Sequence, residues 1–211
     1  EFSHTFSNKE VRGEIHVFKI DKDAEEYISQ GNADLDGAVY GLYAAEDIKH
    51  PNGKSEDVHK KDDLVAQGVI KDGKVDFTNL YLGNYYVKEI SPGEGYLLDE
   101  TIRKFEVDEN GMVIGGGQIT VENDFTKVKI SKQDITNGKE LPGAKLEVRK
   151  EDGTVVEAWT STDKPHLIEA LPEGDYVLRE TMAPKGYQVA QDIHFTVKST
   201  GEVQHVVMKD E

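Results

Sequence analysis

The chain has 211 residues, with 41 Asp and Glu against 25 Lys and Arg, and a formal net charge of −16. This acidity argues against a nucleic-acid binder, which needs clustered Lys and Arg, and against docking to an anionic membrane surface. The absence of cysteine excludes disulfides, zinc–thiolate sites and thiol catalysis, and no apolar run approaches the roughly 18 residues of a membrane-spanning helix.

The chain begins with a segment that we expect to lie outside any domain. Its first residues, Glu1-Phe2-Ser3, are typical of a cut boundary, and no secretory signal is visible. We therefore expect a fragment of a longer protein, with residues 1–8 as a remnant tail. The length that remains allows one large or two small domains.

Short strands with alternating apolar residues make up the first half of the chain. Apolar residues alternate along residues 15–19, 85–89 and 119–123, and Gly, Pro, Asn and Asp separate these segments. No long helical period appears. This combination predicts an all-β sandwich.

Two polar stretches interrupt the first half. Residues 23–34 and 47–63 are rich in charge, and the second contains Pro51-Asn52-Gly53, which predicts a surface loop. Residues 24–29 are a candidate short helix. The acidic run at 21–26 lacks the Gly and the closing Glu spacing of a calcium loop, so we expect a solvated loop and no metal site.

The second half repeats the first half in the same order. We therefore expect two similar domains, residues 9–125 and 126–211, without a flexible linker between them. The matching segments are Lys19-Ile20-Asp21 with Lys132-Gln133-Asp134, Leu35-Asp36-Gly37-Ala38 with Leu141-Pro142-Gly143-Ala144, residues 80–89 with 171–180, and the closing strands 119–123 with 206–210.

Ionisable or amide side chains occupy positions in phase with the apolar faces of the strands. In each half a Lys, a Glu and an Asn or Asp point toward the interior from three strands. The first set is Lys19, Glu89 and Asn123, and the second set is Lys132, Glu180 and Asp210. Burying isolated charges is costly, so these groups must pair or change protonation state.

Two interpretations of these sets are open. A buried Lys–Glu ion pair near each strand end is the commoner arrangement in proteins. The alternative is an intramolecular amide, in which the Lys amine attacks the Asn or Asp side-chain carbonyl while the Glu shuttles protons and is not consumed. The occurrence of the same three residue types twice, in the same order and phase, favours the second interpretation.

The matching elements resemble those of the B-type (CnaB, or SpaA-like) domains of Gram-positive collagen adhesins and sortase-assembled pilins. The resemblance rests on the Lys-x-Asp, Leu-x-Gly-Ala and Gly-x-Tyr-x-x-x-Glu elements and the terminal strand, and it covers nearly the whole chain. The second half is similar to the CnaB domain of a streptococcal fibronectin-binding protein, carried by residues 129–134, 176–181 and 205–210.

The resemblance implies two tandem β-sandwiches of the transthyretin-like or immunoglobulin-like kind, one in each half. It implies a Lys–Asp bond between Lys132 and Asp210 with Glu180 as the catalytic residue, and a Lys–Asn bond between Lys19 and Asn123 with Glu89 in that role. It also implies an extracellular, cell-wall location and no cofactor. Neither the Tyr-Pro-Lys motif of pilins nor a Leu-Pro-x-Thr-Gly sorting signal occurs in the chain.

Three classes of function follow from these observations. The leading one is a structural segment of an adhesin or pilin stalk, whose partners are neighbouring domains or subunits. The second is a binding module for a host matrix protein. Its binding surface would be the insertion at 47–63 or surface aromatics such as Tyr43, Tyr81 and Tyr86. An enzyme that acts on other molecules is not indicated, because each set turns over once on itself.

Overall fold

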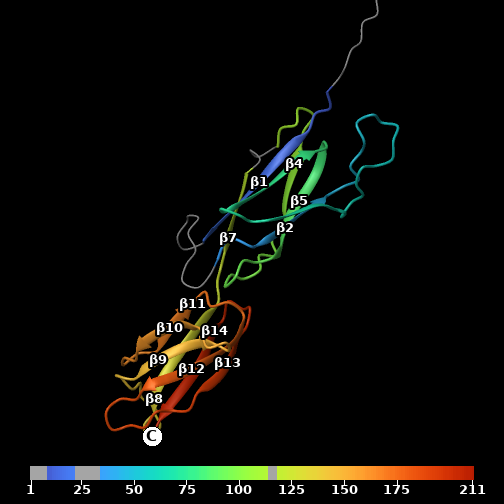
Figure 1. Cartoon of the computed structure of the whole chain (residues 1–211). Helices are drawn as coiled ribbons and strands as arrows, with labels where there is room; N and C mark the ends of the chain where they lie inside the picture. Colours follow the sequence, from blue (N-terminus) through green and yellow to red (C-terminus); the bar gives the residue numbers. More distant parts are fainter. Residues whose placement is uncertain (1–8, 22–33, 114–117) are drawn as a thin grey trace, which may run out of the picture. The chain divides into compact units, whose positions relative to one another are not determined.

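The computed structural model describes residues 9–21, 34–113 and 118–211 (Figure 1). The candidate helix at 24–29 lies outside these residues, as does all of the acidic run at 21–26 except Asp21. Every regular element in the described ranges is a β-strand, so they contain no helix that could cross a membrane. The all-β expectation is confirmed.

The first seven strands form two sheets. A three-stranded sheet has the order β4-β1-β7, and a four-stranded sheet has the order β3-β2-β5-β6. The strands are β1 (Gly13–Asp21), β2 (Val39–Ala44), β3 (Leu64–Val69), β4 (Lys74–Leu80), β5 (Gly83–Ser91), β6 (Arg103–Val107) and β7 (Gln118–Asn123).

The last seven strands repeat this topology strand for strand. Their sheets have the orders β11-β8-β14 and β10-β9-β12-β13, so β8 to β14 correspond to β1 to β7. The strands are β8 (Lys127–Asp134), β9 (Lys145–Lys150), β10 (Val155–Thr160), β11 (His166–Glu169), β12 (Gly174–Met182), β13 (Ile193–Val197) and β14 (Val203–Asp210). The repeat found in the sequence is therefore a repeat of fold.

Each pair of sheets encloses its own apolar core, because alternate strand residues face inward. In β5 the residues Tyr85, Val87 and Glu89 are buried while their neighbours are more exposed, and β12 shows the same alternation. The first core gathers Ile15, Val17 and other residues of β1 to β7, and a separate core gathers residues of β8 to β14.

The Leu-x-Gly-Ala element marks the entry to the second strand of each unit. Its glycines, Gly37 and Gly143, adopt positive φ angles of 87° and 96°, which L side chains rarely adopt. The alanines that follow, Ala38 and Ala144, are fully buried. The repeated glycine is thus explained by backbone conformation, and the repeated alanine by close packing.

The described chain divides into two compact units at Glu122 and Asn123. Of the described residues before that point, Asp21, 34–35 and 93–98 also group with the second unit. Within that unit Leu35, Tyr96, Phe125 and Ala170 form a small buried cluster of their own. The domain boundary between residues 125 and 126 stays a prediction.

Candidate functional site

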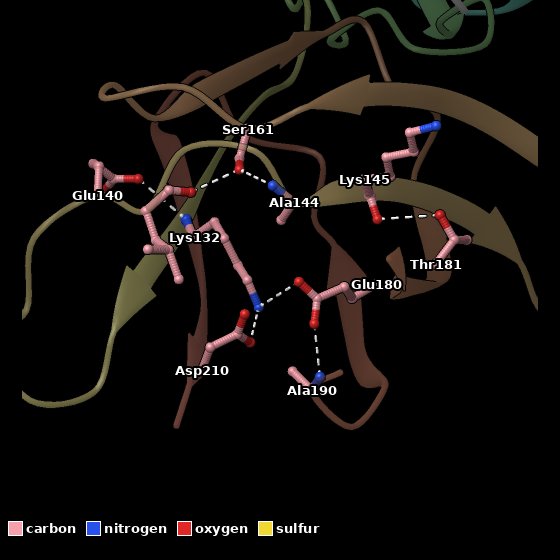
Figure 2. Close-up of polar contacts among 10 residues, drawn as sticks. Lys132, Glu140, Ala144, Lys145, Ser161, Glu180, Thr181, Ala190 and Asp210 are labelled. Atoms are coloured by element: carbon pink, nitrogen blue, oxygen red, sulfur yellow. Dashed lines mark hydrogen bonds and ion pairs between the residues drawn. The ribbon is translucent and has the colours of Figure 1, made fainter. Parts of the chain in front are cut away.

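The second unit brings its three predicted residues together in one buried site. Lys132 on β8 extends its ammonium group between two carboxyl groups, Glu180 on β12 and Asp210 on β14 (Figure 2). Lys132 Nζ donates a hydrogen bond to Asp210 Oδ1 and lies 3.1 Å from Glu180 Oε1. Since all three residues are at most 3% exposed, water does not screen their interaction.

Backbone pairing fixes Asp210 although it is the penultimate residue. Strand β14 runs parallel to β8, with Met208 opposite Lys132 and Asp210 opposite Asp134. The Asp210 carbonyl also accepts a hydrogen bond from the Ile135 amide at 2.9 Å. The last strand therefore presents the Asp210 side chain to the interior, beside the amine of the first strand.

A backbone amide holds the Glu180 carboxylate in place. Ala190 N donates to Glu180 Oε2 at 2.7 Å, which leaves Oε1 directed at Lys132 (Figure 2). On the other side of Lys132, its own backbone N–H donates to Glu140 Oε2 at 3.1 Å. The free oxygen of Asp210, Oδ2, is buried and has no hydrogen-bond partner among the described residues.

The first unit builds an equivalent buried Lys–Glu contact around Lys19. Lys19 Nζ donates to Glu89 Oε1, and the Asp99 amide donates to Glu89 Oε2 at 2.7 Å. Lys19 is fully buried and Glu89 is 4% exposed. Burial lowers the pKa of Lys19, and the Glu89 carboxylate offsets part of this effect. The amine is thereby brought closer to its neutral, nucleophilic form.

Asn123 is the last residue of β7, the strand that neighbours β1 in the three-stranded sheet. It is 1% exposed, and its Nδ2 donates to the Leu97 carbonyl at 2.8 Å. A hydrogen-bonded side-chain amide at this position is a neutral electrophile. It needs no proton before an amine can attack it.

Sequence reasoning missed the amide that orients each glutamate. In both units the donor is the backbone N–H ten residues after the Glu, at Asp99 and at Ala190. These two positions differ in residue type, so no side-chain motif marks them. The signal in the sequence is the equal spacing that follows two matching strands.

The two sites differ in the residues around the glutamate. Tyr40 lies opposite Glu89 in the β2–β5 ladder, where Leu146 lies opposite Glu180 in the β9–β12 ladder. Asp99 carries a carboxylate that pairs with Arg103 at 2.8 Å. Ala190 and Ile193 occupy the corresponding positions of the second unit, because Ile193 pairs with Leu178 as Arg103 pairs with Val87. At these three positions the first site has polar side chains and the second has apolar ones.

Aromatic side chains stack on one another in both units. Tyr43 and Tyr86 stack on each other with ring centroids 5.1 Å apart, and Trp159 stacks on His166 at 4.3 Å. Across the residues described, no group of three or more His, Asp or Glu side chains is arranged to hold a metal ion.

Comparison with known families matches both halves of the chain. The family model described as "SpaA: Prealbumin-like fold domain" matches residues 13–120 and again residues 126–211. Prealbumin-like is the transthyretin-like sandwich that the resemblance implies, and its two matches coincide with the two seven-stranded repeats.

Two curated relatives are proteins of Staphylococcus aureus. The collagen adhesin is 35% identical over 83 residues, which are 35% of this chain and 7% of that protein. Serine-aspartate repeat-containing protein D of strain Newman is 28% identical over 165 residues, which are 66% of this chain and 12% of that protein. The chain thus spans only a small part of the length of the relatives it matches.

Solved structures agree with this fold. The Bacillus anthracis TIE protein superposes with a TM-score of 0.59 at 26% identity, covering 95% of this chain and 34% of that chain. A C-terminal fragment of the pilus adhesin SpaC from Lactobacillus rhamnosus GG superposes with a TM-score of 0.55 at 15% identity, covering 94% of this chain and 96% of that fragment. The chain therefore belongs to the SpaA prealbumin-like (CnaB-type) domain family, and its two tandem domains are related to adhesins and pilins of Gram-positive bacteria.

Proposed function

We propose that the chain is a structural segment of a surface adhesin or pilin anchored to the cell wall of a Gram-positive bacterium. Each domain, 9–125 and 126–211, is closed by an amide that the domain forms itself. The observation that carries the proposal is the buried contact of the Lys132 amine with both Glu180 and Asp210. The family relationship to adhesins and pilins supports the location.

In the second domain the reaction joins an amine and a carboxylic acid. A proton moves from the Lys132 ammonium to Asp210, which gives a neutral nucleophile and a neutral electrophile. Lys132 Nζ then attacks Asp210 Cγ, the C–N bond forms, a C–O bond breaks and water leaves. Glu180 carries protons between these groups, and its attachment to the Ala190 amide keeps it in reach throughout.

In the first domain the electrophile is the Asn123 amide. Glu89 accepts a proton from Lys19, Nζ attacks Asn123 Cγ and the C–Nδ2 bond breaks. The leaving nitrogen takes a second proton from Nζ and the one held by Glu89, so it departs as an ammonium ion and Glu89 returns to its carboxylate form. Amide formation from unactivated groups is slow in water. A folded domain that holds the partners in contact replaces the bimolecular encounter with an intramolecular one of very high effective molarity.

The resulting amides join the first and last strands of each sandwich. Lys132 and Asp210 are 78 residues apart in sequence, so nearly the whole second domain becomes a closed loop. By the chain-entropy relation used for disulfides, closing such a loop stabilises the domain by about 4.5 kcal/mol. A stalk built this way resists extension and proteolysis without any cysteine.

Single-molecule pulling on the intact chain tests this function. The 78-residue separation of Lys132 and Asp210 corresponds to roughly 260–280 Å of extended chain. With the amide in place, this length stays hidden at any force below bond rupture. The Glu180→Gln variant releases it in one step. A wild-type domain that extends by the full length would contradict the proposed function.

A second candidate function rests on the insertion at 47–63. Its base is fixed, because Ile48 is buried in the core and Asp57 pairs with both Lys49 at 2.7 Å and Lys60 at 2.6 Å. Its tip, residues 51–56, is exposed throughout. A surface loop presented in a fixed shape suits recognition of a host matrix protein.

Removing only the tip separates this candidate from loss of folding, since a deletion that included Ile48 would open the core. Residues 51–56 are replaced by two glycines, and binding to immobilised collagen is compared with that of the unchanged chain. Collagen is the probe because a relative is named a collagen adhesin. Binding by the unchanged chain that is lost on tip replacement supports the candidate, and equal binding or no binding by both refutes it.

A further inference from the structure

Tyr40 is a buried polar residue at a position where the second domain has a leucine. Its side chain is 0% exposed, it lies opposite Glu89 in the ladder of β2 and β5, and its ring centroid is 5.9 Å from Lys19 Nζ. In the second domain Leu146 fills the same position opposite Glu180. The fold itself therefore accepts an apolar side chain here.

The hydroxyl of Tyr40 is buried and has no hydrogen-bond partner within the described part of the chain. Other buried tyrosines do have one, since Tyr85 donates to the Tyr81 carbonyl and Tyr176 to the Pro172 carbonyl, each at 2.8 Å. Burying an unsatisfied hydroxyl is costly. Because leucine would fit at this position without an unsatisfied hydroxyl, the tyrosine indicates a role for its hydroxyl beyond packing.

The hydroxyl is kept in its donor form by its surroundings. Burial raises the pKa of Tyr40, and the negative charges of Glu89 and Asp99 raise it further. The phenol is therefore a neutral O–H group near the Glu89 carboxylate. Such a donor can stabilise the Glu89 carboxylate by a hydrogen bond once Lys19 has lost its positive charge.

The two reactions differ in what they do to the charge of the site. In the first domain, an ammonium group and a neutral amide become an amide and a departing ammonium ion, so the pair of Lys19 and Glu89 changes from neutral to −1. In the second domain, an ammonium group and a carboxylate become an amide and water, and the net charge is unchanged. Both glutamates lose the lysine cation that they contact at the start, but only the Lys–Asn reaction makes the net charge of its site more negative.

We propose that Tyr40 is a positioning residue of the first site, whose hydroxyl binds the Glu89 carboxylate as the Lys19 charge is lost. The inference rests on the proposed function and deepens it. It explains why the donor is present in the Lys–Asn site and replaced by Leu146 in the Lys–Asp site. The Asp99 amide already holds Glu89 Oε2, so the oxygen that Tyr40 would bind is Oε1, which Lys19 contacts before the reaction.

The test compares two Tyr→Phe variants of the full chain. The chain is made by cell-free translation, samples are quenched in denaturant at intervals, and each loss of mass is assigned to its domain by peptide mapping. Tyr40→Phe is expected to slow loss of about 17 Da from the first domain by about tenfold, the effect of losing one charge-assisted hydrogen bond. Loss of about 18 Da from the second domain provides an internal control.

Stability is measured separately, by urea unfolding in an Asn123→Ala background that cannot form the first bond. There Tyr40→Phe is expected to leave the midpoint unchanged or higher, because it removes an unpartnered hydroxyl. Tyr85→Phe is the matched control. It removes a bonded hydroxyl from the same core, so it is expected to lower the midpoint and leave the rate unchanged. Tyr40→Leu, the residue of the second domain, is expected to slow the reaction as Tyr40→Phe does.

Equal rates for wild type and Tyr40→Phe would overturn the inference and leave the proposed function intact. A slower rate accompanied by a lowered midpoint would also overturn it, since that is the result of a structural role. Absence of any 17 Da loss in the wild-type chain would overturn the first bond itself, and the role of Tyr40 with it.

Discussion

Replacing Glu180 by Gln is expected to abolish the second amide and to lower the stability of that domain sharply. Gln keeps the volume of the side chain, and Lys132 remains paired with Asp210, so the direct cost of the change is small. Closing the loop between residues 132 and 210 stabilises the folded domain by about 4.5 kcal/mol. For a domain of this size that corresponds to a fall in Tm of roughly 20–35 °C.

The assay combines intact-protein mass with calorimetry. The variant is expected to retain the water lost by the wild type, and only the transition of the second domain is expected to move, because each domain has its own core. Glu140→Gln is the matched control, since Glu140 contacts the backbone N–H of Lys132 and not its amine. A variant that still loses water would refute the role of Glu180. A decrease in Tm of less than about 5 °C would refute the loop-closure argument.

Three further predictions follow from the geometry and charges of the sites. Asp210→Asn starts about 1 Da lighter than the wild type but, once cross-linked by loss of ammonia, has the same final mass, which peptide mapping and mass spectrometry check. Because burial lowers the pKa of Lys19 below its ordinary 10.5, the rate of the first reaction is expected to rise with pH and to level off before that value; a rate that keeps rising through pH 10.5 argues against it. The hydrogen bond from Arg179 lowers the pKa of Asp192, a contribution that is present above the ordinary Asp value of 3.8 and lost as pH falls through the lowered one. Arg179→Ala is therefore expected to reduce Tm slightly at neutral pH and not in strong acid, as measured by thermal unfolding across pH.

The strand pattern could be predicted from the sequence because burial enforces a period of two. Lys19 and Lys132 stand in phase with Ile15 and Ile130, and the structure buries all four. Because the sequence repeats, it also predicts that the two halves share one topology. These features are local in sequence or set by alternation, so they need no knowledge of distances.

Other features depend on contacts between strands that no local pattern encodes. Asn79 and Ala170 occupy equivalent positions with φ of 58° and 57°, and neither residue is a glycine that would have marked the turn. Ile48 lies in the core although the insertion around it is polar. The pairing of Tyr40 with Glu89 becomes visible only once the register of β2 and β5 is known.

The central claim is that both domains close themselves with an amide, and the intact mass of the purified chain tests it most directly. The account predicts a mass about 35 Da below that of the sequence, the sum of one ammonia and one water. Fragment ions that link residue 19 to 123 and residue 132 to 210 locate the two losses. A mass equal to that of the sequence would contradict the account and leave two buried ion pairs in its place.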